Sequence, residues 1–287
     1  MSRLRSTRTG LVVPSLPIIE TDQVQHAKSA PDGGAFDAPS LVRDEPYHDY
    51  LLRLGDDSLV LGQRLAEWCG HAPGLEVDLS LANLALDLIG QATHLLTQAN
   101  DGDGDALAFH RDVLDYRNCW LVEQPNGDFA RTIARQMLFS TYQHLLYREL
   151  SASPDAFLAG LAAKAVKEVA YHRELASDWT IRLGDGTEES ARRMAEGLDW
   201  CWRFVPELFE VDARLEALIA LGTVPDPRGF EAEYRAAIAA VLAEAKLDVP
   251  ADQRPILGGR RGHHSEHLGH VLAVMQHLPR TYPNATW

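Results

Sequence analysis

The sequence predicts an all-α fold, a bundle of long helices with additional helices toward the C-terminus. From Tyr47 onward, apolar residues recur at spacings of three and four, the period of one face of a helix. No segment alternates apolar and polar residues over a useful length, so strands are not expected. Several predicted helices are longer than about 20 residues, which favours one bundle domain.

The composition excludes several classes of protein. With 46% hydrophobic residues in 287, the chain can bury a large core, and it is not disordered throughout. Its net charge of −14 argues against nucleic acid or an anionic membrane as a partner. The three cysteines lack the spacing of a disulfide framework or zinc site, and no run of 18 apolar residues exists. We therefore expect a soluble, cytoplasmic protein with protein partners and no membrane span.

The sequence predicts two regions that differ in composition and in apolar periodicity. Residues 1–45 contain prolines at 14, 17, 31 and 39 and the Gly33–Gly34 pair, and they sustain no apolar period. Such a segment cannot bury enough surface to offset the entropy of ordering it, so we expect a flexible or disordered N-terminal arm. Residues 46–287 are expected to form the helical domain.

The first helices of that domain are delimited by glycine. One is expected from Tyr47 to Gly70, and a second from about Asp78 to Ala99, with leucines on one face and polar residues on the other. The Asp-Gly-Asp-Gly sequence at 101–104 ends the second helix. A shorter helix is expected at about 106–116.

Capping residues mark the later helices. Asp128 can cap a helix that runs to about Leu150. Ser153 is the expected N-cap of the next helix, with proline following it, and that helix runs to Leu183 over roughly 40 Å. Thr187 starts another helix, which Pro206 kinks or ends. Two more are expected at about 228–247 and 265–278.

Two of these helices look like incomplete halves of a carboxylate-bridged di-metal site. Such a site takes one inward Glu from each of two helices and a Glu-x-x-His pair from each of the other two. Glu67 and Asp87 are candidate carboxylates, but Gly90 stands where the second helix needs His. His172 is the candidate histidine of the other helix, but Val169 stands where it needs Glu. We expect Glu67, Asp87 and His172 to be degenerate positions that hold no metal, with no catalytic or cofactor-binding residue in this chain.

A second candidate is the C-terminal cluster of His263, Glu266, His267 and His270. His263 with His267, and Glu266 with His270, are four residues apart and could chelate a divalent ion. The cluster lacks ligands from another helix. A capped or partner-facing turn is the alternative. The preceding loop, 258–262, has three glycines and two arginines and could cradle a phosphate, which alone is a weak signal.

Four long blocks of the sequence resemble a known family. They are residues 54–73, 81–91, 122–130 and 262–269, and the likeness extends from about Asp49 to Trp287. The blocks resemble the C subunits of the bacterial phenylacetyl-CoA epoxidases. The chain departs from the usual pattern in its N-terminal arm and in His263 and His270.

This resemblance implies a ferritin-like, non-catalytic structural subunit of a multicomponent oxygenase that epoxidises the aromatic ring of phenylacetyl-CoA in aerobic phenylacetate degradation. It implies that the di-iron centre resides in a catalytic A subunit, that a small B subunit bridges pairs, and that a flavin and iron–sulfur reductase supplies electrons. Two alternatives remain. The chain could be a di-metal oxygenase subunit with its own atypical metal site, or a free-standing helical binding protein.

Overall fold

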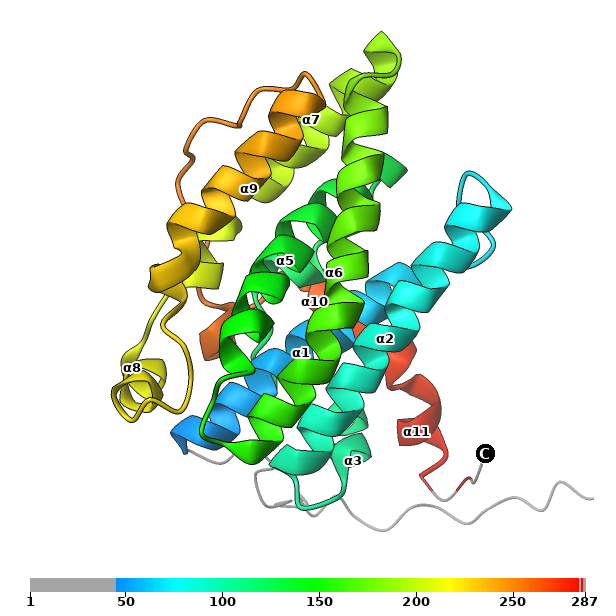
Figure 1. Ribbon diagram of the computed structural model, residues 1–287. Coiled ribbons are helices and arrows are strands. Elements are labelled where there is room, and N and C mark those ends of the chain that lie inside the picture. The colour runs from blue at the N-terminus through cyan, green and yellow to red at the C-terminus, as the bar shows by residue number, and fades with distance from the viewer. Residues whose placement is uncertain (1–44, 284, 286–287) are drawn as a thin grey trace, which may run out of the picture. The chain divides into compact units, whose positions relative to one another are not determined.

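A computed structural model describes residues 45–283 and 285, and this part of the chain is helical without a strand (Figure 1). Apart from Glu45, the predicted N-terminal arm lies outside the described residues. The longer α-helices are α1 Pro46–Ala66, α2 Leu75–Ala99, α5 Phe129–Leu150, α6 Ala156–Gly184, α7 Glu188–Trp202 and α9 Glu231–Glu244. The shorter ones are α3 Gly104–Phe109, α4 Trp120–Glu123, α8 Ala213–Ala220, α10 Glu266–Met275 and α11 His277–Thr281. Four 3₁₀ turns are η1 Val113–Asp115, η2 Val205–Phe209, η3 Pro227–Phe230 and η4 Gly259–Arg261. The predicted all-α bundle is confirmed.

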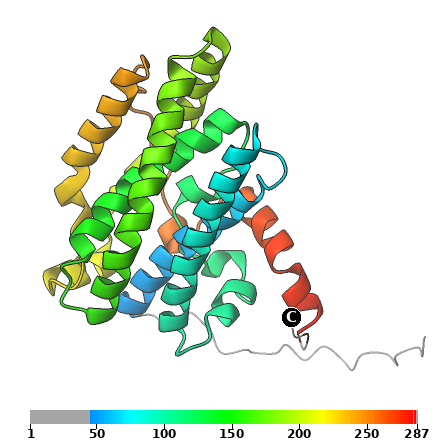
Figure 2. The same cartoon turned by 45° about the vertical axis from the view of Figure 1, so that its right-hand side comes forward.

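Two antiparallel helix pairs form the centre of the bundle, α1 with α2 and α5 with α6 (Figures 1 and 2). Glycines on α1 allow α2 to approach closely, since a Cβ on Gly55 would lie 2.8 Å from Leu96 and one on Gly62 would lie 3.0 Å from Ile89. Helix α7 packs on α5, and α9 lies along the flank beside α6. None of the described helices is both long and apolar enough to cross a membrane.

Helix α1 carries buried charge as well as buried leucine. Asp56 forms an ion pair with Arg111, and both side chains are almost fully buried. Asp57 accepts a hydrogen bond at 2.7 Å from Arg260, a residue of η4. Buried charges are tolerated when they are paired and hydrogen-bonded, so these contacts attach the segments around Arg111 and Arg260 to the central helices.

Two of the predicted helix caps are confirmed, and one is corrected. Asp128 accepts from the backbone N–H of Arg131 at the start of α5, and Thr187 starts α7 within a capping box. Helix α6 is capped by Asp155 instead of Ser153. The Ser153 hydroxyl accepts a hydrogen bond from the N–H of Asp155, so Ser153 stabilises the turn that precedes the helix.

The predicted helix at 106–116 is divided. Helix α3 ends at Phe109, and Asp112 adopts an extended backbone before the η1 turn. The break places Arg111 where its Nε donates to the carbonyl of Leu107 and its guanidinium reaches Asp56. Helix α8 was not predicted. Pro206 lies in η2, after α7 has ended. The helix expected at 265–278 is split into α10 and α11.

Candidate functional site

Amide side chains connect the interior faces of α2, α5 and α6. Gln91 of α2 is 4% exposed, and its Oε1 accepts from Gln143 Nε2 at 3.1 Å and from the Tyr147 hydroxyl at 3.4 Å. Its Nε2 donates to Glu168 Oε2 at 3.1 Å. Burial raises the pKa of Tyr147 to about 12, so its hydroxyl remains a donor at neutral pH. Neutral side chains therefore connect α2 and α5 at this point of the interior.

Asp87 and His172, two of the predicted positions, lie next to each other. His172 Nε2 is 3.1 Å from Asp87 Oδ2, with the imidazole fully buried and the carboxylate 38% exposed. Burial lowers the pKa of His172, and the hydrogen bond and negative charge of Asp87 oppose that effect. His172 Nδ1 is buried and has no hydrogen-bond partner among the described residues.

The predicted orientation of α2 needs a correction. Leu84, Leu88 and Gln91 face the interior, whereas Asp87 lies at the edge of that face and Gly90 is exposed. Gly90 therefore does not occupy the place of a missing interior ligand. On α6, Val169 and His172 are both fully buried and do face inward.

The expectation that Glu67 points into the bundle is wrong. Glu67 is the C-cap of α1, and its side chain is 44% exposed. It accepts from Arg64 Nη1 at 2.9 Å and from Asn126 Nδ2 at 2.8 Å. Because α1 ends at Ala66, this carboxylate contacts the turn around Asn126 instead of the interior.

Helix α5 carries a stripe of four polar residues that is buried as a whole. Gln136, Ser140, Gln143 and Tyr147 are each at most 3% exposed. The Gln136 amide and the Ser140 hydroxyl have no hydrogen-bond partner among the described residues. The stripe supplies amides and hydroxyls but no carboxylate.

This set of donors does not fit a carboxylate-bridged di-iron centre. Two iron ions need several anionic ligands, and the interior around Gln91 offers His172 together with neutral amides and a phenol. Asp87 and Glu168 approach from the edge, where each already accepts a hydrogen bond. Across residues 45–283, no group of three or more His, Cys, Asp or Glu side chains is placed to hold a metal.

A groove of about 460 Å³ lies between α2 and α6, on the outer side of the Asp87–His172 pair. The groove is open beside Gly90 and Gly160, where an added Cβ would meet no described atom within 4 Å. Its walls are apolar at Leu86, Phe157 and Leu161. Charged and polar groups border it, namely Asp87, His94, Lys164 and Glu168.

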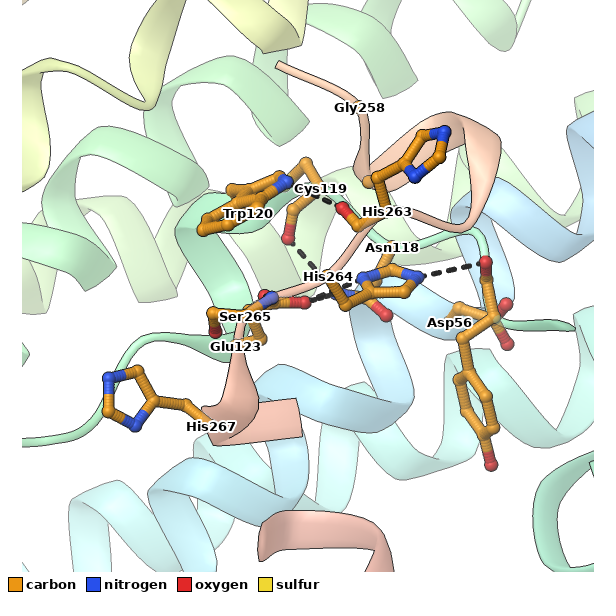
Figure 3. Close-up of polar contacts among 12 residues, drawn as sticks. Asp56, Asn118, Cys119, Trp120, Glu123, Gly258, His263, His264, Ser265 and His267 are labelled. Carbon is orange, nitrogen blue, oxygen red and sulfur yellow. Dashed lines mark hydrogen bonds and ion pairs between the residues drawn. The ribbon is translucent and has the colours of Figure 1, made fainter. Parts of the chain in front are cut away.

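The C-terminal histidine cluster is not assembled as a chelate (Figure 3). The side chains of His263 and His267 point in different directions, and the rings of His267 and His270 are 6.5 Å apart. Glu266 is exposed at the first position of α10. The backbone carbonyl of His263 accepts from Trp120 Nε1 at 2.7 Å, so this turn is attached through its main chain.

His264, which was not a candidate, is the histidine of this turn that lies in the interior. Its Nδ1 is 2.8 Å from Glu123 Oε2, and its Nε2 is 3.0 Å from the carbonyl of Tyr116 (Figure 3). Glu123 also accepts from the N–H of Ser265 at 2.6 Å and from Asn118 Nδ2 at 2.9 Å. His263 is exposed, and because the turn is irregular its sequence does not predict which of the two adjacent histidines is buried.

The glycine loop 258–262 does bind an anionic group, but that group belongs to this chain. Glu207 Oε1 accepts from the N–H groups of Gly258 and Gly259 at 2.8 and 2.7 Å, and its Oε2 accepts from Trp120 N at 2.6 Å. A nest of backbone N–H groups commonly holds an anion. Here the carboxylate of η2 takes the place that a phosphate would take, so the loop is a structural element.

Fold and interior together define an all-α bundle protein whose helices α2, α5 and α6 are joined by amides, and within its described residues no cluster of His, Cys, Asp or Glu side chains is placed to hold a metal ion. The family model described as "Phenylacetic acid catabolic protein" matches residues 36–287, and the chain belongs to that family. It is 48% identical over 242 residues to the C subunit of the 1,2-phenylacetyl-CoA epoxidase of Escherichia coli (strain K12). That alignment covers 83% of this chain and 98% of the relative.

Proposed function

We propose that this chain is the non-catalytic structural subunit of a multicomponent phenylacetyl-CoA epoxidase that works in the cytoplasm. The likeness to the Escherichia coli relative supports membership of such a complex. The observation that supports the non-catalytic role is the interior around Gln91, where amide side chains connect the long helices α2, α5 and α6. This chain would carry no cofactor, and the di-iron centre would reside in the catalytic A subunit.

The other components are part of the same proposal. A small B subunit would bridge pairs of A and C subunits, and a flavin and iron–sulfur reductase would deliver electrons to the assembled complex. The chain itself would support the catalytic subunit, which predicts an obligate interface of more than roughly 2,000 Å² with an apolar centre.

The outer face of α2 has the features of that interface. Leu75, Leu79 and Leu86 are 72, 57 and 66% exposed and follow one stripe of the helix. Leu86 also lines the groove beside α6, so the stripe and the groove form one surface. A helix of a paralogous bundle could lay an apolar side chain into that groove.

Reconstitution with the catalytic subunit and reductase tests the proposal. We expect epoxidation to fall when this chain is withheld and to return when it is added. Leu79→Glu should weaken the association, whereas Leu221→Glu, at a residue 76% exposed beyond α8, should not. Full activity of the catalytic subunit and reductase without this chain would contradict the structural role.

The alternative is a protein with its own atypical metal site, which the juxtaposition of Asp87 and His172 favours. Iron analysis after loading with ferrous iron under anaerobic conditions separates the two. We expect about a tenth of an equivalent or less. A value near two equivalents would establish the alternative instead.

A further inference from the structure

A second pocket, remote in sequence from the groove, is lined mainly by arginine. Its volume is about 380 Å³, and its lining residues are Arg117, Asp212, Ala213, Arg214, Arg260 and Arg261. They come from three segments, the link between η1 and α4, the start of α8, and η4. Four guanidinium groups line this one small pocket, in a chain whose net charge is −14.

The arginines differ in depth, and the deep ones are held in place by the protein. The side chains of Arg260 and Arg117 are 8 and 13% exposed, whereas those of Arg214 and Arg261 are 40 and 45% exposed. Arg117 Nη1 donates to the carbonyls of Leu114 and Tyr116 at 2.8 Å. Arg260 Nη2 donates to Asp57 at 2.7 Å. The positive floor is therefore preorganised before any ligand arrives.

The carboxylates nearby contact these arginines. Glu210 pairs with Arg261, and Asp49 is shared among several guanidiniums. Asp49 contacts three guanidiniums, Arg53 at 2.6 Å, Arg214 at 3.1 Å and Arg117 at 3.6 Å, and the last exceeds a hydrogen-bond length. Burial lowers the pKa of Arg117, as expected of a cation only partly compensated.

Asp212 is the acidic residue in the lining of this pocket, and its carboxylate accepts hydrogen bonds from residues that do not line it. Its Oδ2 accepts from Arg53 at 2.5 Å and its Oδ1 caps α8 through the N–H of Leu215 at 3.0 Å. The start of α8 adds the partial positive charge of a helix N-terminus on the same side as Ala213.

We infer that this pocket binds a phosphate group of a small soluble ligand. Guanidinium groups match phosphate oxygens in pairs, and arginines at the floor and the rim can contact different oxygens of one tetrahedral anion. The volume lies at the lower end of small-molecule sites, roughly 300–1,000 Å³, and suits a phosphate or diphosphate with part of its ester. A concave floor formed by Arg117 and Arg260 fits a compact anion better than an extended acidic segment of a protein.

Calorimetric titration of the full-length chain with inorganic diphosphate, at constant ionic strength, tests the site. We expect saturable binding that Arg261→Gln weakens roughly tenfold or more, as for the loss of one charge-assisted contact. Arg192→Gln is the matched control, because Arg192 is exposed on α7 and pairs only with Glu189 and Glu196 among the described residues. Circular dichroism of both variants checks that the fold is retained. Arg117→Gln is a second variant for the floor.

The outcomes are separable from those of the proposed function, since no partner protein or turnover is involved. Free coenzyme A in place of diphosphate tests one source of the phosphate, because tighter binding with the same loss in Arg261→Gln would assign the site to the phosphates of coenzyme A. Equal binding by Arg261→Gln and Arg192→Gln would overturn the inference. So would the absence of saturation at millimolar diphosphate, or binding of a polyglutamate peptide where diphosphate does not bind.

Discussion

Asp57 and Arg260 are 203 residues apart in the chain, and their side chains meet at 2.7 Å inside the fold. Both are at most 8% exposed. Asp57 also accepts from the N–H of Cys119 at 2.7 Å, so one carboxylate joins α1, the start of α4 and the C-terminal loop.

Removing one member of this pair should be costly. Arg260→Met would leave the Asp57 charge buried without its cation, and we expect the free energy of unfolding to fall by about 3–5 kcal/mol. The double variant with Asp57→Asn should recover part of that loss, because no unpaired charge remains. Urea denaturation of the three proteins provides the measurement. Equal stability of Arg260→Met and the unmodified protein would contradict the structural role of the pair.

His172 should make the protein less stable in mild acid. Burial lowers its pKa in the folded state below the ordinary value of 6.5, so the unfolded chain binds more protons between the two pKa values. The contribution of the neutral imidazole is therefore complete above about pH 6.5 and is lost as the pH falls below it. His172→Gln should flatten the dependence of melting temperature on pH from 7.5 to 5, and exposed His263→Gln should not. An unchanged slope in His172→Gln would refute this assignment.

Two glycine-to-alanine variants should have opposite effects. A Cβ on Gly259 would lie 2.3 Å from the carbonyl oxygen of Asn118, so alanine there should destabilise the fold by about 1–3 kcal/mol. A Cβ on Gly160 of α6 would meet no described atom within 4 Å, and alanine there should stabilise the helix by about 1 kcal/mol. Thermal denaturation of both variants compares them in one experiment. A destabilised Gly160→Ala would mean that the groove is filled.

Metal removal should leave the fold unchanged. The interior is joined by Gln91, Gln143 and Tyr147 through hydrogen bonds that need no ion. Prolonged dialysis against EDTA is expected to shift the melting temperature by less than about 1 °C, since no metal-binding free energy is lost. A substantial fall, reversed by ferrous iron, would indicate a resident metal.

Periodicity and caps were sufficient to predict the long helices but not the polar interior. Asp128 and Thr187 could be identified as caps because their hydrogen bonds are local. Asp87 and Gln91 are four residues apart on one polar face of α2, and only the packing of α6 decides that Gln91 turns inward. The pairing of Arg111 with Asp56 joins distant segments, and no local signal encodes it.

Helix α8 shows why periodicity does not predict short elements. It has eight residues, of which only Leu215 and Leu218 are buried, and such a pattern does not differ from chance. Its N-cap Asp212 was equally ambiguous, because aspartate also begins turns.

The long-range pairing of Asp57 has a consequence for how the protein is made. At roughly 5–20 residues per second, a ribosome that has just synthesised α1 needs on the order of ten to forty seconds to reach Arg260. During that interval Asp57 lacks the guanidinium that pairs with it, and a charge without its partner favours water over the core. The central helices therefore reach their final packing only once the C-terminal loop has left the ribosome, and a chain cut short before η4 would be a natural substrate for chaperones and proteases.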